Sequence, residues 1–94
     1  MLEKSVWRYS GQLHNLILLV QQDDEGDTPT QRVIILKEVG RWRVKIKTLE
    51  VAHPDFKKLA PKRFILEALG FAASEGYIKL EGPLTADNLE EIKA

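Results

Sequence analysis

Residues 33–47 read VIILKEVGRWRVKIK and carry the clearest structural signal in the chain. From Arg41 to Lys47, charged and apolar side chains alternate without interruption, which is the two-residue period of a half-buried β-strand. The β-branched residues that open the stretch also favour a strand, and Gly40 supplies a turn. We therefore predict strands at residues 32–39 and 41–47. The side chains of the second strand that we expect to face a core are Trp42, Val44 and Ile46.

The rest of the N-terminal half leaves two alternatives open. In the first, strands cover residues 6–9 and 13–22, with a turn at Ser10-Gly11 and a loop at 23–31. In the second, residues 13–22 form a helix, because their apolar side chains follow the i, i+3, i+4, i+7 spacing of one helical face. A second helix would then begin at Thr28-Pro29 and end at Gly40. We prefer strands for residues 32–47, and residues 13–22 remain open between the two.

The C-terminal half contains residues that are typical of the beginnings and ends of helices. Residues 55–58 can form a short helical piece after His53-Pro54, and Pro61 suits the first position of a helix that Gly70 would end at residue 69. Residues 77–81 alternate as a strand, and a last helix would begin at Thr85. We therefore predict a single α+β domain over residues 1–94. Its antiparallel sheet, from the N-terminal half, would pack on two or three helices of the C-terminal half.

Length and composition bound the class of protein. The 94 residues are enough for one core, and 44% hydrophobic with 30% charged residues is ordinary for a globular protein. The longest apolar run, residues 16–20, is far shorter than the roughly 20 residues of a membrane span. We expect no membrane association and no secretion signal. The absence of cysteine favours the cytoplasm.

Charge is distributed unevenly although the formal net charge is zero. Residues 28–63 hold ten basic and three acidic side chains, whereas the segments before and after are acidic. Clustered charge sets a local potential that the total does not report, and this suggests an acidic partner. The alternative is that the acidic ends fold back onto the basic middle and neutralise it.

A basic strand face is the candidate binding site. If the apolar residues of 41–47 point inward, the cations between them project together at about 6.6 Å intervals. Arginine and lysine in such a row suit a polyanion, either a nucleic-acid backbone or an acidic peptide. Basic residues further along the chain could extend the row. The candidate binding residues are Arg41, Arg43, Lys45, Lys47, Lys57, Lys58, Lys62 and Arg63.

Catalytic and metal-binding patterns are not found. The chain has no cysteine and only two histidines, His14 and His53, which are far apart in sequence. The acidic run at residues 23–27 lacks the ligand spacing of a calcium loop, and the glycines have no phosphate-binding spacing. We therefore predict no enzyme activity, no cofactor, no metal and no small-molecule substrate.

The last 40 residues resemble the C-terminal part of PUB domains. The similar segments are 64–71 (FILEALGF), 75–80 (EGYIKL) and 88–92 (NLEEI), and residues 53–56 (HPDF) stand where that family has an Asn-x-x-Phe element. The resemblance implies an α+β adaptor that docks the acidic C-terminal tail of an AAA ATPase without catalysis.

Two functions follow as expectations. The first is a protein-interaction module that binds an acidic segment of a partner through the basic surface. The alternative is a nucleic-acid-binding protein that contacts the phosphate backbone with the basic strand 41–47. We interpret Trp7 and Trp42 as core residues rather than as platforms for base stacking. The oligomeric state is left open.

Overall fold

The computed structural model of the chain describes residues 2–11, 14–23, 30–52, 60–80 and 82–93. Its four N-terminal segments are strands, so the strand alternative is confirmed, and the helical alternative is wrong for the described residues 14–22 and 30–39. Three of them are longer than predicted, the one predicted at residues 13–22 ends one residue later, at Asp23, and a fifth strand lies near the C-terminus. Their bounds are β1 (Leu2–Ser10), β2 (Asn15–Asp23), β3 (Thr30–Val39), β4 (Trp42–Ala52) and β5 (Leu89–Glu91).

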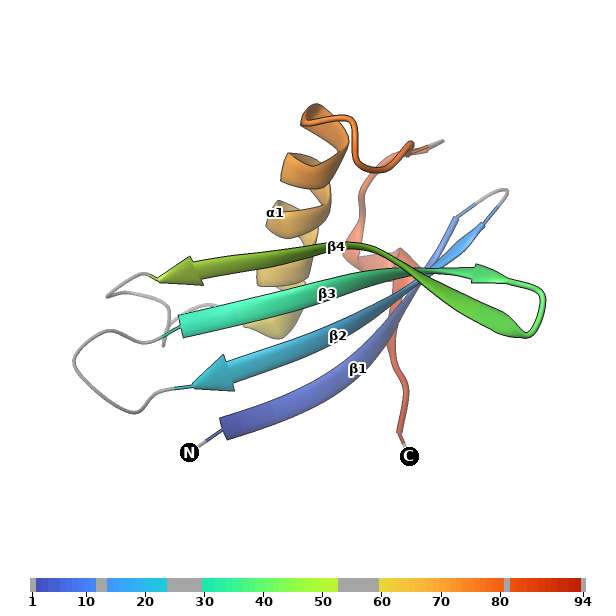
Figure 1. The fold of residues 1–94 in the computed structure, drawn as a ribbon. Coiled ribbons are helices and arrows are strands. Elements are labelled where there is room, and N and C mark those ends of the chain that lie inside the picture. Colours follow the sequence, from blue (N-terminus) through green and yellow to red (C-terminus); the bar gives the residue numbers. More distant parts are fainter. Residues whose placement is uncertain (1, 12–13, 24–29, 53–59, 81, 94) are drawn as a thin grey trace.

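The strands form one antiparallel sheet in the order β4-β3-β2-β1-β5, and helix α1 (Pro61–Ser74) covers one face of it (Figure 1). Alternate residues of the central strands face the helix, as the two-residue period of a strand requires. The core lies between these layers. Its completely buried members include Leu18, Ile35, Ile65 and Leu69. We call the other side of the sheet the open face, and Val6, Leu19 and Ile34 lie in register across it.

The prediction of two or three helices is wrong, because the described residues contain one α-helix. Instead of the helix expected from Thr85, the chain forms a short 3-10 turn, η2 (Ala86–Asn88), followed by β5. A helix of so few residues is marginal on its own, whereas β5 pairs with the edge of β1. The N–H of Ile92 also donates to the carbonyl of Val6 at 2.8 Å, and Leu89 is buried. Strand pairing therefore outweighs local helix preference here.

Helix α1 continues past Gly70, so the predicted end at residue 69 is wrong. The helix ends instead before Gly76, whose φ is +81°. The N–H of Gly76 donates to the carbonyl of Ala73 at 3.1 Å, and that of Tyr77 donates to Ala72 at 2.9 Å. This pair of bonds is the Schellman ending, which requires a left-handed residue that glycine adopts without strain.

Two further expectations concern the segments beside α1. The helical piece expected at residues 55–58 lies outside the described residues. Residues 77–80 are described and are not part of a strand, so that prediction is wrong. They run instead as irregular chain, with Ile78 buried and Leu80 packed on the core cluster.

The hairpin of β3 and β4 has two special points. Val39 and Trp42 pair across a two-residue turn in which Gly40 has φ +60°, as in the glycine-first turns that match the twist of paired strands. Further along, Ile35 pairs with Lys47 but Leu36 pairs with Lys45, so Ile46 is the extra residue of a β-bulge. The bulge reverses the alternation of side chains in β4.

Candidate functional site

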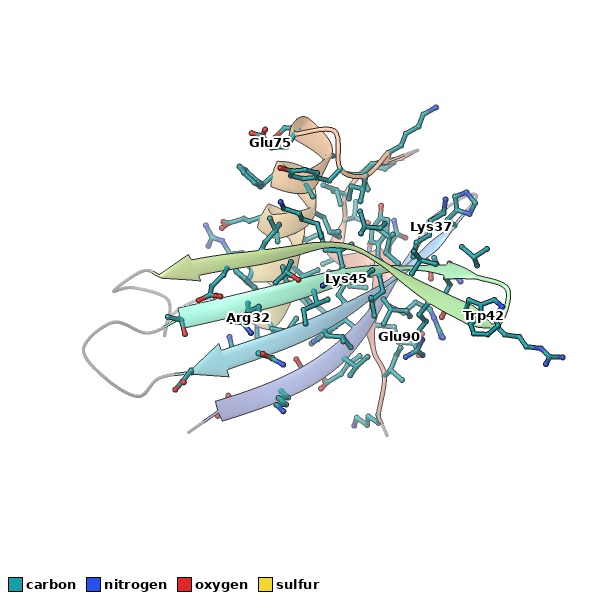
Figure 2. All side chains as sticks on the ribbon, viewed as in Figure 1. Arg32, Lys37, Trp42, Lys45, Glu75 and Glu90 are labelled. Atoms are coloured by element: carbon teal, nitrogen blue, oxygen red, sulfur yellow. The ribbon has the colours of Figure 1, made fainter. Side chains whose placement is uncertain are left out.

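The turn end of the β3–β4 hairpin exposes large apolar side chains. Trp42 is 74% exposed, Val44 is 53% exposed and Val39 is 49% exposed. The prediction that Trp42 and Val44 face a core is therefore wrong, and only Ile46 packs against the core. The reason is visible in Figure 2, where Trp42 lies at the end of the hairpin that extends beyond α1. We call Val39, Trp42 and Val44 the hairpin patch.

A pocket of about 250 Å³ opens beside the hairpin patch. It lies between the ends of β1 and β2, the hairpin, and the irregular segment that follows α1. We call it the hairpin pocket. Its apolar lining consists of Leu16, Ile46, Ile78 and Leu80, its aromatic lining of Tyr9 and Tyr77, and its basic lining of His14, Lys37 and Lys79; Gly11 completes it.

Strand register makes the pocket and the hairpin patch one continuous surface. Tyr9 pairs with Leu16, Leu16 pairs with Lys37, and Lys37 pairs with Val44. Directly paired residues of antiparallel strands point to the same face, so these four side chains form a row across the sheet. The row begins inside the pocket and ends at the hairpin patch.

Tyr9 and Tyr77 contribute to the pocket in different ways. Tyr9 is buried, and its hydroxyl donates to the carbonyl of Pro83 at 3.3 Å, which connects β1 to the segment after α1. Tyr77 is 41% exposed, and the Nζ of Lys47 lies 4.4 Å from its ring centroid. A cation over an exposed ring contributes about 0.5–1 kcal/mol, so this contact steadies the pocket wall without closing it.

Positive charge dominates around the pocket. Lys37 and Lys79 line it, Lys47 adjoins it through Tyr77, and no carboxylate lines it among the residues that the structure describes. Glu38, the acidic residue next to Lys37, points to the open face, where the Nη2 of Arg8 donates to its Oε1 at 3.1 Å. The pocket therefore presents cations that this part of the chain does not neutralise.

Of the eight predicted binding residues, the structure describes six and does not bring these six into one patch. Arg43 pairs with Glu38 and Lys45 with Leu36, which places both on the open face, whereas the bulge turns Lys47 to the helix side. Arg41 lies in the exposed turn.

The remaining four predicted residues belong to α1 or precede it. Lys62 and Arg63 are in its first turn, next to Pro61, which lines a hollow with Glu3 and Gln22 at the opposite end of the sheet from the hairpin patch. Lys57 and Lys58 lie outside the described residues.

The alternative that acidic ends neutralise the basic middle can be compared with the ion pairs of the described ranges. These pairs join Arg8 to Glu38, Arg32 to Glu50 and Arg63 to Glu67. Within those ranges, none involves the basic residues of the pocket or of the hairpin end. Arg41, Arg43 and Lys45 are therefore not paired with the described carboxylates of either terminus.

Sequence reasoning missed Lys37, Lys79, Tyr77 and His14 as members of a site. Lys37 had a usable signal, because it continues the inward-facing series of Val33 and Ile35 and is a cation where a core residue is expected. The other three had none, since their positions depend on how irregular segments fold onto the sheet.

Comparison with known proteins finds no matching family model, no similar curated protein and no similar solved structure. The resemblance to PUB domains stays a prediction. In the described part of the chain, no cluster of three or more His, Asp or Glu side chains is arranged to hold a metal ion. Its one α-helix lacks the length and apolar character needed to cross a membrane.

Proposed function

We propose that this protein is a non-catalytic docking module. Its hairpin pocket and hairpin patch would bind a segment of a partner protein that contains both acidic and apolar side chains. The observation that carries the proposal is the exposure of Trp42, at 74%, on a hairpin end that adjoins the pocket lined by Lys37 and Lys79, for which the described residues supply no carboxylate partner. The absence of cysteine supports placing this activity in the reducing cytoplasm.

The chemistry of the surface supports a protein partner. Tryptophan and arginine are enriched among the residues that dominate binding energy at protein interfaces, and apolar contact there supplies most of the affinity. The surrounding cations would steer an acidic segment and reject a basic one. An extended segment that alternates carboxylates and apolar side chains satisfies both requirements.

Fluorescence anisotropy with labelled peptides tests this proposal. A peptide in which glutamate alternates with valine should bind, and a peptide in which lysine alternates with valine should not. The double variant Lys37→Glu/Lys79→Glu should weaken binding of the glutamate peptide by about tenfold or more, because each reversal replaces attraction with repulsion. Lys4→Glu is the matched control, since Lys4 is exposed at the other end of β1.

Equal binding of the two peptides would contradict the proposal, as would equal effects of the pocket and control reversals. Circular dichroism of each variant ensures that a loss of binding is not a loss of fold.

Nucleic-acid binding is the second candidate, and one observation favours it. Trp42 is exposed and is flanked in sequence by Arg41 and Arg43, of which Arg41 lies in the adjoining turn. Stacking of bases on aromatic rings with nearby arginine is how single strands are bound without sequence preference. A ten-nucleotide oligothymidylate separates the candidates. If it binds with a log–log salt slope near −0.7 per contacted phosphate and the glutamate peptide does not bind, nucleic acid is the partner.

A further inference from the structure

We infer that the hairpin pocket receives one ring-sized apolar side chain of the acidic segment, as the anchor of the docked partner. This inference rests on the proposed function and makes it more specific. The hairpin patch would contact residues on one side of the anchor, and the basic lining would contact carboxylates beside it.

The volume of the pocket fits one side chain. At about 250 Å³ it is larger than the roughly 150 Å³ cavity that holds a benzene molecule. It is smaller than the roughly 300–1,000 Å³ of pockets that bind drug-sized molecules or cofactors. The volume is therefore sufficient for a phenyl or indole ring.

The lining favours an apolar ring over a nucleobase. Leu16 and Ile78 are buried, Ile46 and Leu80 are half-buried, and together they offer hydrocarbon contact. The hydroxyl of Tyr9 is already bonded to the carbonyl of Pro83. Base edges present both donors and acceptors, whereas Lys37 and Lys79 only donate and the described lining contains no amide or carboxylate side chain.

The basic side chains of the pocket determine which residues of the partner are favoured next to the ring. Lys37 is half-buried, while Lys79 is exposed and lines the same pocket. A ring in the pocket thus places its neighbouring residues next to two ammonium groups, which favours carboxylates at those positions. From Lys37 to Val39, the chain advances about 6.6 Å, the same spacing as two residues of an extended peptide. When the ring of an extended peptide is in the pocket, a peptide residue about two positions from the ring can therefore contact Val39 and Trp42.

Two glutamate-rich nonapeptides, one with phenylalanine and the other with alanine at the centre, test the inference by fluorescence anisotropy. We expect the phenylalanine peptide to bind the wild-type protein about tenfold or more tightly than the alanine peptide, the ratio expected for burying one such ring. Tyr77→Ala, which removes a pocket wall, should abolish this ratio. Phe71→Ala is the matched control, because Phe71 is a 52% exposed aromatic residue of α1 that does not line the pocket.

A second pair of variants tests filling instead of removal. Leu80→Phe should occupy the pocket from within and lower the ratio, and Leu19→Phe makes the same change at a half-buried residue of the open face. Thermal melts of all four variants identify any that fail to fold. If a variant of one pair fails to fold, the binding ratios of the other pair test the inference.

The outcomes separate the inference from the proposed function. A ratio that disappears only in the pocket variants supports the inference. Equal affinities of the two glutamate-rich peptides for the wild-type protein overturn the inference, and the proposed function stands if both bind more tightly than a lysine-rich peptide of the same length. Failure of both glutamate-rich peptides to bind overturns the two together. Binding of oligothymidylate that Tyr77→Ala weakens, without binding of the phenylalanine peptide, assigns the pocket to a base and also overturns the inference.

Discussion

Trp7 and Trp42 are on the same sheet but differ in burial. Trp7 is 6% exposed, and its Nε1 donates to the Oγ of Ser5 at 2.9 Å. Trp42 also lies on the helix side of its strand by register, yet α1 does not extend far enough to cover it (Figure 2). The local alternation around Trp42 is that of a half-buried strand, so the sequence predicted that its apolar side is buried. The error arises because burial depends on where the helix lies, which the pattern within the strand does not contain.

Alanine substitutions of the two tryptophans should therefore have very different effects on stability. Trp7→Ala should lower the free energy of unfolding by about 3–5 kcal/mol, because it leaves a cavity in the core. Trp42→Ala should change it by no more than about 0.5 kcal/mol, as is usual for a surface substitution. Urea denaturation of each variant measures both values. A loss above about 2 kcal/mol for Trp42→Ala would mean that Trp42 is part of the core.

Trp42→Ala should nevertheless impair docking. Loss of an aromatic anchor at an interface commonly costs about 2 kcal/mol or more, which corresponds to a loss of affinity of about thirtyfold. The affinity of the glutamate–valine peptide, measured by anisotropy on the folded variant, checks this. Unchanged affinity would remove the hairpin patch from the binding surface.

At the scale of elements, the β3–β4 hairpin was largely predictable, whereas the C-terminal half was not. Alternation in 41–47 and the glycine at 40 gave the second strand and the turn. The bulge at Ile46 could not be foreseen, because the sequence alternates through it without a break. After α1, the segments at 77–80 and 89–91 take their conformation from packing on the sheet and from pairing with β1, and their local patterns point elsewhere.

Two glycine substitutions test these element boundaries, because they should change the stability of the protein in opposite directions. Gly40→Ala should destabilise the protein by about 1–2 kcal/mol, because φ of +60° crowds a Cβ against the backbone. Gly70→Ala should stabilise it by up to about 1 kcal/mol, since the residue is inside α1 and an added Cβ would meet only Leu84 Cδ1, at 3.7 Å. Thermal or urea unfolding measures both. The same sign for the two would contradict the assigned turn or the assigned extent of the helix.

For the molecule as a whole, the uneven charge distribution along the sequence predicted a basic surface, but it did not predict which residues form that surface. Sequence reasoning chose the charged side of strand 41–47, and the fold divides those cations between the two faces of the sheet. The surface that combines charge with exposed apolar groups lies on the helix side, and the ends of β1 and β2, the hairpin and residues 77–80 all contribute to it. Residues that meet from such distant segments cannot be grouped by spacing along the chain.

Ionic strength should therefore affect docking only in part. The cations are near the surface and are screened within about 10 Å at 0.1 M salt, whereas contact with Trp42 and Val44 is apolar. We expect the affinity of the glutamate–valine peptide to fall between 50 mM and 500 mM salt and then to level off, as measured by anisotropy. A continuous decline to no binding would indicate a purely ionic association without the apolar contact.

The most direct measurement is a titration of the isotope-labelled protein with the glutamate–valine peptide, followed by backbone amide chemical shifts. Docking on the helix side predicts the largest changes at Lys37, Trp42, Val44 and Lys79, together with a shift of the indole N–H of Trp42. Changes concentrated instead on the open face around Leu19 and Ile34, or at the far end of the sheet around Lys4, would contradict the proposed surface.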